Sequence, residues 1–411
     1  RIRGREPPAF VLKIVQDYTT TFSASAATAL PVISAFHTFS WAGLLISPVA
    51  ILGVLVLMWA YLGGLFLSIL YLPLAQALSW PIVQGTLLYQ GLMAWTAGLP
   101  FAVTRAATPA WLSIMLLVGL LALGTRYVMI SKRRRGLLAL VIIILLFSLP
   151  LIPQANPVYY IQLSAGTADS ALILDGDKTL VIDTGEHGGD LAHFILARGR
   201  KIDSLIITHL HGDHAGGLEQ LLKQDVPIGE ILLPTGALEA EASEESLQLL
   251  SLARQRGIPV EALGAGDEIR LSRVSGRVLW PHHGAVYPGL SANATSLVTL
   301  WDLDGVSLLS TGDITADYSR YLDVSAQVLK VPHHGSRLDA TEALIRRVNP
   351  EIALITASGT QPERYQAATG RLLAAGALYC ITGETGAVTI TCQDGQAHLS
   401  GHLKGGTIHG L

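Results

Sequence analysis

The chain has 411 residues, of which 50% are hydrophobic and 14% charged, and its formal net charge is −3. This length excludes a single ordinary domain and allows two substantial cores. Residues 1–154 carry ten Lys or Arg and two acids, whereas residues 155–411 carry eighteen and twenty-nine, which gives net charges of +8 and −11. Twelve of the 13 histidines also lie in the second part. We therefore predict two domains, 1–154 and 155–411, that face different solvents.

The first part has no charged side chain between Tyr18 and Thr104. Because a helix needs about 20 apolar residues to cross a bilayer, we expect an all-α, polytopic membrane region. The clearest predicted spans are Val49–Leu72, Trp111–Ile130 and Leu137–Ile152. Segments 24–46 and 74–101 contain prolines and glycines, so they could span, re-enter the bilayer or lie along its surface. An inert multi-helix anchor is one interpretation of this region.

Four consecutive cations, Lys132 to Arg135, stand between two of these apolar segments. The positive-inside rule places that loop in the cytoplasm, so the next helix would deliver Pro153 and all that follows to the outer face. We predict a multi-pass protein of the cell membrane with an extracytoplasmic C-terminal domain. The chain begins with Arg1 and not with a start methionine, so we expect a fragment or a truncated gene product in which membrane helices upstream are missing. No signal-peptide pattern is visible.

From Val158 onward the pattern changes to short β-branched runs that alternate with helical stretches. The predicted strands are 158–163, 171–174, 180–182, 204–207, 296–300 and 306–309, and the predicted helices are 191–198, 241–255, 341–348 and 364–375. This order suits an α+β fold in which helices cover both outer faces of two packed sheets, an αββα sandwich.

Three histidines and one aspartate follow the apolar run 204–207 within six positions: His209, His211, Asp213 and His214. Neutral nitrogen donors beside an anionic oxygen suit Zn²⁺ or Mn²⁺. In an extended segment, residues two apart share a face, so we expect His209 and His211 to bind one ion. Asp213 and His214 would then point toward a second ion. A polar turn of solvated histidines is the alternative.

This H-x-H-x-D-H motif resembles the signature of the metallo-β-lactamase superfamily. Three other elements occur in the order typical of that superfamily, namely the strand-turn Leu180–Gly185, the run Leu308–Asp313 and the run Val328–Ser336. The resemblance implies the αββα sandwich and a hydrolase with two divalent metal ions, Zn or Mn. We expect Asp313 to bridge the ions, and His333 or His334 to complete the second ion's ligands.

The remaining site residues are predicted with alternatives. The pair His282–His283 could supply a third nitrogen to the first ion through His283, or it could be a surface loop. We expect Asp183 and Asp169 to orient imidazoles. Lys330 and Ser336 could contact a substrate phosphate or be solvated. The predicted catalytic residues are Asp213, Asp313 and Lys330, acting with a metal-bound water that loses its proton near neutral pH.

A narrower resemblance rests on Leu329–Ser336, Thr311–Asp313 and Asn293–Ser296, with Leu30–His37 and Gly43–Pro48 in the membrane part. These segments are similar to the ComEC family of DNA-uptake channel proteins. The resemblance implies a polytopic channel for single-stranded DNA and an outer metal-dependent nuclease that degrades the other strand. The implied partners are DNA, the lipid bilayer and other competence proteins.

The chain departs from that family at two turns. It has Gly166-Thr167-Ala168-Asp169 where the family has Gly-Gln-Gly-Asp, and Gln361-Pro362 where a His-Pro pair is usual. The net charge of −11 is also unfavourable for binding phosphates, so the ions with Lys330 and Arg337 would have to form a local positive patch. The alternatives are a hydrolase of small-molecule or envelope phosphodiesters or of lactones, and a non-catalytic DNA-transport protein.

The two cysteines, Cys380 and Cys392, flank a predicted hairpin around 383–386. A tight turn there would place Cys380 opposite a residue near Thr389 and so disfavour a disulfide. An oxidising exterior would permit one, and the sequence leaves both outcomes open.

Overall fold

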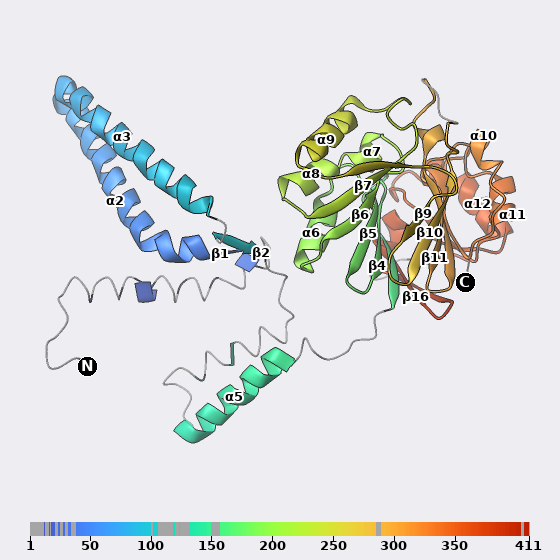
Figure 1. Cartoon of the computed structure of the whole chain (residues 1–411), viewed down its shortest axis with the longest axis horizontal. Coiled ribbons are helices and arrows are strands. Elements are labelled where there is room, and N and C mark those ends of the chain that lie inside the picture. The colour runs from blue at the N-terminus through green and yellow to red at the C-terminus, as the bar shows by residue number, and fades with distance from the viewer. Residues whose placement is uncertain are drawn as a thin grey trace. The chain divides into compact units, whose positions relative to one another are not determined.

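The computed structural model describes residues 38–99, 102–105, 131–148, 157–284, 289–403 and 407–410, with a few isolated positions before residue 34 and between 118 and 123. The chain forms two compact units, made mainly of residues 1–152 and of residues 153–411 (Figure 1). Each unit has its own structure and is described separately.

The first unit contains a helical hairpin. Ser40 caps the first helix by accepting a hydrogen bond from the backbone N–H of Gly43 at 2.9 Å, and Tyr71 separates the two helices. The two short strands pair antiparallel at the open end of the hairpin. The elements are β1 (Thr38–Ser40), α2 (Trp41–Leu70), α3 (Leu72–Ala97), β2 (Val103–Arg105) and α5 (Lys132–Ser148).

One helix segment among the described residues, Ile46–Leu70, is long and apolar enough to cross a membrane. Its mean hydropathy is 2.3 and none of its most apolar stretch is buried. The predicted span Val49–Leu72 matches this segment, although α2 ends at Leu70. The predicted span Leu137–Ile152 overlaps α5, whereas Trp111–Ile130 lies largely outside the described residues.

The second unit contains two mixed sheets. The larger sheet has the strand order β17-β16-β3-β4-β5-β6-β7-β8 and the smaller has the order β15-β14-β13-β12-β11-β10-β9. Pairing is parallel from β5 to β8 and from β12 to β15, and antiparallel elsewhere. The strands of the larger sheet are β3 (Val158–Gln162), β4 (Ser170–Asp175), β5 (Lys178–Thr184), β6 (Ile202–Ile206), β7 (Ile228–Pro234), β8 (Val260–Leu263), β16 (Val388–Gln393) and β17 (Gln396–Gly401).

Helices lie on the outer sides of the two sheets (Figure 1). The smaller sheet consists of β9 (Glu268–Arg270), β10 (Val274–Trp280), β11 (Val298–Leu303), β12 (Val306–Ser310), β13 (Val328–Lys330), β14 (Ile352–Ile355) and β15 (Leu378–Ile381). The helices are α6 (Gly189–Ala197), α7 (Gly212–Ala215), α8 (Leu218–Lys223), α9 (Glu244–Gln255), α10 (Ala316–Ser319), α11 (Glu342–Val348), α12 (Gln366–Ala374) and α13 (Thr382–Thr385), with 3₁₀ turns η2 (Asn293–Thr295), η3 (Pro332–Gly335) and η4 (Pro362–Arg364). This arrangement confirms the predicted two-sheet sandwich.

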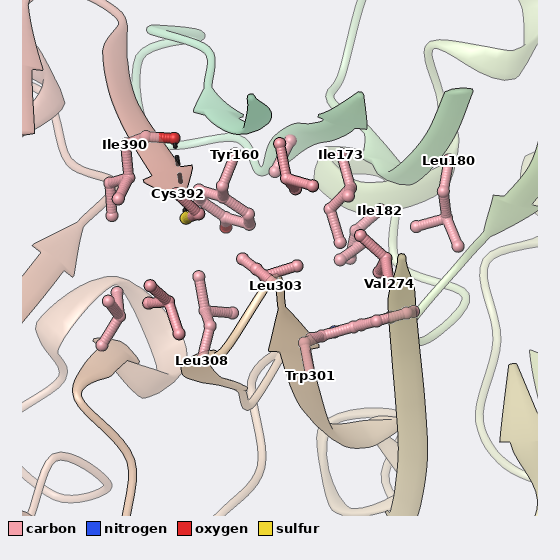
Figure 2. Close-up of a cluster of buried hydrophobic side chains, with 14 of the residues drawn as sticks. Tyr160, Ile173, Leu180, Ile182, Val274, Trp301, Leu303, Leu308, Ile390 and Cys392 are labelled. Atoms are coloured by element: carbon pink, nitrogen blue, oxygen red, sulfur yellow. Dashed lines mark hydrogen bonds between the residues drawn. The ribbon is translucent and has the colours of Figure 1, made fainter. Parts of the chain in front are cut away.

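The core of the second unit lies between the sheets (Figure 2). The larger sheet contributes Tyr160, Ile173 and Leu180, and the smaller sheet contributes Trp301 and Leu308, each at most 1% exposed. Burial of such side chains stabilises by about 1.5–3 kcal/mol each relative to exposure. This packing fixes the sheets against each other, so loops at the carboxyl ends of β5, β6, β12 and β13 have defined positions. In parallel sheets that edge is where ligands bind.

The structure between the two cysteines differs from the hairpin that the sequence predicted. Cys380 lies on β15 and Cys392 on β16, and these strands belong to different sheets with α13 between them. The predicted hairpin around 383–386 is therefore wrong, because the chain crosses from one sheet to the other at this point. Both thiols are free and buried. Burial raises the pKa of Cys380 to about 11 and that of Cys392 to about 12.

Candidate metal centre

Asp183 is the last residue but one of β5, and it holds the start of the histidine motif. Its carboxylate accepts hydrogen bonds from the backbone N–H of Thr208 at 2.7 Å and from the Thr208 hydroxyl at 2.8 Å. It also accepts one from Nδ1 of His214 at 2.7 Å. Asp183 has φ 60, a left-handed conformation that Asp tolerates better than most residues. The aspartate therefore orients an imidazole, as the sequence predicted.

An extended conformation was expected for the motif, but the structure differs. Helix α7 begins at Gly212, with His211 as its N-cap. His209 Nε2 lies 3.1 Å from His211 Nδ1, so these two side chains do come together. The ring of His214 is also close, with its centroid 4.1 Å from that of His209. The first turn of α7 thus places His214 next to His209, whereas the sequence predicted that His214 points toward a second ion. Asp213 is about two-fifths exposed.

Two glycines allow α7 to lie directly against the loop after β5. A Cβ atom added to Gly188 would lie 2.3 Å from the carbonyl oxygen of Gly217, and one added to Gly217 would lie 2.2 Å from that of Thr184. The backbone N–H of Gly217 donates to the carbonyl of Gly185 at 2.7 Å. This close approach of two backbones fixes the position of the helix that carries Asp213 and His214.

Asp313 follows β12 and lies among three imidazoles. Its Oδ2 is 3.5 Å from Nε2 of His214, 3.9 Å from Nε2 of His333 and 3.4 Å from Nε2 of His334. Nε2 of His334 is also 3.5 Å from Asp213. The structure therefore brings both His333 and His334 to the site, whereas the sequence could not choose between them.

Each of these three imidazoles is held through its other nitrogen. Nδ1 of His214 donates to Asp183, Nδ1 of His333 donates to Asp339 at 2.7 Å, and Nδ1 of His334 shares a hydrogen bond with Thr356 at 3.1 Å. A partner on Nδ1 fixes the ring and directs Nε2 toward the site, which is the arrangement typical of metal-binding histidines.

The loop that carries the paired histidines has an unfavourable backbone. His333 has φ 50 and His334 has φ 54, both in the left-handed region, which costs about 1–2 kcal/mol for each such residue. The hydrogen bonds to Asp339 and Thr356 offset this cost. Residues held in such conformations cluster at functional sites.

Four residues converge closely enough to share an ion. One ligand atom from each of Asp169, His214, Asp313 and His334 lies within 4.8 Å of the others. Each of the four also has a buried side-chain nitrogen or oxygen without a hydrogen-bond partner among the described residues. Since buried polar atoms are normally paired, this donor set fits a divalent cation.

The electrostatics of the site agree with a cation site. Burial alone would raise the pKa of Asp313, but His214 and His334 lower it well below its ordinary value. Burial opposes protonation of His214, yet Asp313 and Asp183 raise its pKa well above the usual range. Burial and the nearby His214 lower the pKa of His209 well below its ordinary value. The buried carboxylate of Asp313 therefore stays ionised and attracts positive charge.

Asp169, one of the four cluster residues, forms a buried ion pair with Lys330, and both side chains are at most 5% exposed. Burial raises the pKa of Asp169, but the charges of Lys330, His334 and His214 together outweigh this effect and lower it. Asp169 was expected to orient an imidazole, whereas it lies in the cluster itself. Lys330 is therefore not solvated, because its side chain is 5% exposed and its ammonium pairs with Asp169.

The structure does not bring His283 to the four-residue cluster. Its Nε2 lies 3.3 Å from Asp267, and its side chain is 59% exposed. Ser296 instead lies beside the first histidine, with its hydroxyl 3.4 Å from Nδ1 of His209 and accepting a hydrogen bond from the backbone N–H of Asp313 at 3.0 Å. The roles of Ser296, Asp339 and Thr356 were missed, because each depends on contacts between distant strands.

Comparison with known proteins identifies the domain. Residues 163–359 match the model described as the metallo-beta-lactamase superfamily. The chain is 33% identical over 173 residues to ComE operon protein 3 of Bacillus subtilis (strain 168), which covers 41% of this chain and 21% of that protein. It is 27% identical over 237 residues to Recombination protein 2 of Haemophilus influenzae, covering 54% of this chain and 27% of that protein.

A third relative extends the match toward the membrane part. The chain is 25% identical over 335 residues to Competence protein ComA of Neisseria gonorrhoeae, covering 77% of this chain and 40% of that protein. The chain thus spans less than half the length of each of these relatives. Residues 163–359 form a metallo-beta-lactamase superfamily domain, and the resemblance of the chain to the ComEC family is confirmed.

Proposed function

We propose that this protein takes part in DNA uptake during natural competence. In this proposal residues 155–411 are a metal-dependent nuclease that hydrolyses phosphodiester bonds of the strand that is not transported, and residues 1–154 belong to the membrane channel. The names of the relatives, which refer to competence and recombination, support the biological role. The geometry of the centre supports the chemistry.

The observation that carries the proposal is the set of three imidazoles with fixed Nδ1 atoms around Asp313. We propose that His209, His211, Asp213, His214, Asp313, His333 and His334 hold two divalent ions, with Asp313 between them. Two such ions, Zn²⁺ or Mn²⁺, would supply a water that ionises near neutral pH and positive charge for the phosphate.

The residues of the chain keep these donors in place. Asp183 and Asp339 accept from two imidazoles and so hold each ring with Nε2 facing inward. Lys330 is a positioning residue, because it acts through Asp169 rather than on a substrate. Asp213 is the more accessible carboxylate and adjoins the open side of the site.

The nuclease proposal is tested with the full chain in detergent by metal analysis and by cleavage of single- and double-stranded DNA with Mn²⁺ or Zn²⁺. We expect about two ions per chain, and His209→Ala and Asp213→Ala should each lower cleavage at least about a hundredfold. His398→Ala on the exposed strand β17 is the control. A chain that binds no metal, or that converts only small esters or lactones, would contradict the proposal. Unchanged DNA uptake in both variants would indicate a transport role without catalysis.

We further propose that the second unit is extracytoplasmic in a multi-pass membrane protein. Lys132 to Arg135 form the first turn of α5, where cations are unfavourable for the helix dipole, so a different constraint explains them. Cytoplasmic retention of basic residues is such a constraint. Alkaline phosphatase fused after Gln154 should be active, and the same fusion after Ser131 should be inactive. The reverse pattern would overturn this topology.

A further inference from the structure

A groove opens beside the proposed metal centre. Its cavity is about 400 Å³, and its lining includes Asp213, His333 and His334 on the side of the centre, with Arg337 and Arg364 among the other residues. The two arginines come from separate segments, the loop after η3 and the end of η4. The donors that would bind metal and two guanidinium groups therefore share one groove.

The loop that carries Arg337 is held in place by hydrogen bonds. Nη1 of Arg371, on α12, donates to the carbonyl of Arg337 at 2.9 Å and to that of Ala340 at 2.6 Å. The carboxylate of Asp339 accepts from the hydroxyl of Ser336 at 3.0 Å and from His333. The backbone that presents Arg337 is thus tied to the same aspartate that orients a histidine of the centre.

The segment that carries Arg364 packs against this loop. A Cβ atom added to Gly335 would lie 2.9 Å from Cβ of Tyr365, so only glycine permits the approach. Gly335 has φ 82, which also favours glycine, and Tyr365 is 3% exposed. Because Tyr365 directly follows Arg364, this contact holds η4 close to the paired histidines.

The charges in the groove differ from those of the domain as a whole. Both arginines are exposed, and neither forms an ion pair with a described carboxylate. Asp213 is the one carboxylate in the described lining, and bound cations would neutralise it. The groove would therefore be positive within a domain of net charge −11. Guanidinium groups bind phosphate oxygens with charge-assisted, often bidentate hydrogen bonds.

We propose that Arg337 and Arg364 form a subsite for phosphates that flank the cleaved one. The subsite selects a polynucleotide strand over an ester with a single phosphate, and it supplies the local positive charge that the domain otherwise lacks. This inference rests on the proposed nuclease function, because it assigns the cleaved phosphate to the neighbouring centre.

The test measures binding separately from cleavage. Binding of a fluorescent single-stranded oligonucleotide to the full chain in detergent with Mn²⁺ is followed by anisotropy over a range of salt concentrations. Arg337→Ala and Arg364→Ala should each weaken binding about tenfold and lower the slope of log affinity against log salt by about 0.7. Arg337→Lys and Arg364→Lys should keep most of the slope, because they keep the charge.

Arg346→Ala is the matched control, since Arg346 is 75% exposed and pairs with Glu342 on α11 away from the groove lining. Alanine variants that bind with the affinity and slope of the Arg346→Ala protein would overturn the subsite. Wild-type protein that does not bind the oligonucleotide would do the same.

A second substrate separates the two proposals. The ratio of oligonucleotide cleavage to hydrolysis of bis(p-nitrophenyl) phosphate, which has one phosphate, should fall at least about tenfold in the double alanine variant. Binding that depends on both arginines in a protein that cleaves neither substrate would refute the nuclease function and leave only a phosphate-binding role for the two arginines. An unchanged ratio in an active double variant would refute the subsite and leave the nuclease standing.

Discussion

Helix α2 of the first unit and the core of the second unit contain similar apolar residues, but these are exposed in α2 and buried in the core. Trp59 on α2 is 68% exposed, whereas Trp301 on β11 is 1% exposed. The hydrophobic effect stabilises the second unit in water because its apolar side chains face inward. The exposed apolar surface of α2 would instead fit a lipid environment, in agreement with the proposed membrane region.

The ends of the helices show the same contrast. Helix α9 begins with Ser243 as N-cap and with Glu244 and Glu245 in its first turn, and Arg254 lies in its last turn. This is the charge order that a helix dipole favours in water. Helix α5 begins with four cations and has no acid in its first turn. The preferences of an isolated helix do not explain this charge order, whereas the proposed cytoplasmic position of the four cations would.

Among substitutions that compare the two regions, tryptophan replacements should have the largest effect on the free energy of unfolding. Trp301→Ala should lower the free energy of unfolding of the second unit by about 3–5 kcal/mol, because it leaves a cavity between the sheets. Trp59→Ala should change that free energy by less than about 0.5 kcal/mol. Urea unfolding of the full chain in detergent, followed by near-ultraviolet circular dichroism, measures both. Equal destabilisation by the two variants would remove the distinction between the regions.

A smaller effect is expected for lysine substitutions at two exposed apolar positions. Val56, in the middle of α2, is 67% exposed and Leu373 on α12 is 50% exposed. Val56→Lys should disfavour membrane insertion by about 2.5–3.5 kcal/mol, so less protein should remain in carbonate-washed membranes. Leu373→Lys should alter stability by less than about 0.5 kcal/mol, since this residue faces water. If Val56→Lys has no effect on membrane retention, α2 does not cross the bilayer.

Much of the second unit could be predicted because its pattern is local. Periodicity located β3 to β5 and helices α6, α9, α11 and α12 to within a few residues. The order of strands within each sheet could not be predicted from the sequence, because it depends on pairing between segments that are far apart in the chain. The error at Thr382–Thr385 has this origin, since Gly-Glu-Thr-Gly is typical of a tight turn but here the chain passes between sheets.

The centre was predictable to the same extent. A single motif supplied His209 and His214, and strand ends supplied Asp313 and His334, which the structure gathers together. The place of Asp169 was not predictable, because its partner Lys330 lies 161 residues away and only the packing of the two sheets joins them. His283 was selected by composition alone, and its contact with Asp267 could not be foreseen.

The contact between Gly188 and Gly217 has a consequence for how this domain can vary. Neither residue carries a functional group, yet any added methyl at these positions would meet backbone that cannot rotate away. A library of random substitutions selected for hydrolysis should therefore be as depleted at these two sites as at the histidines. In this part of the molecule the distance between two main chains limits which substitutions are tolerated. The positions of the candidate metal-binding side chains depend on the same distance.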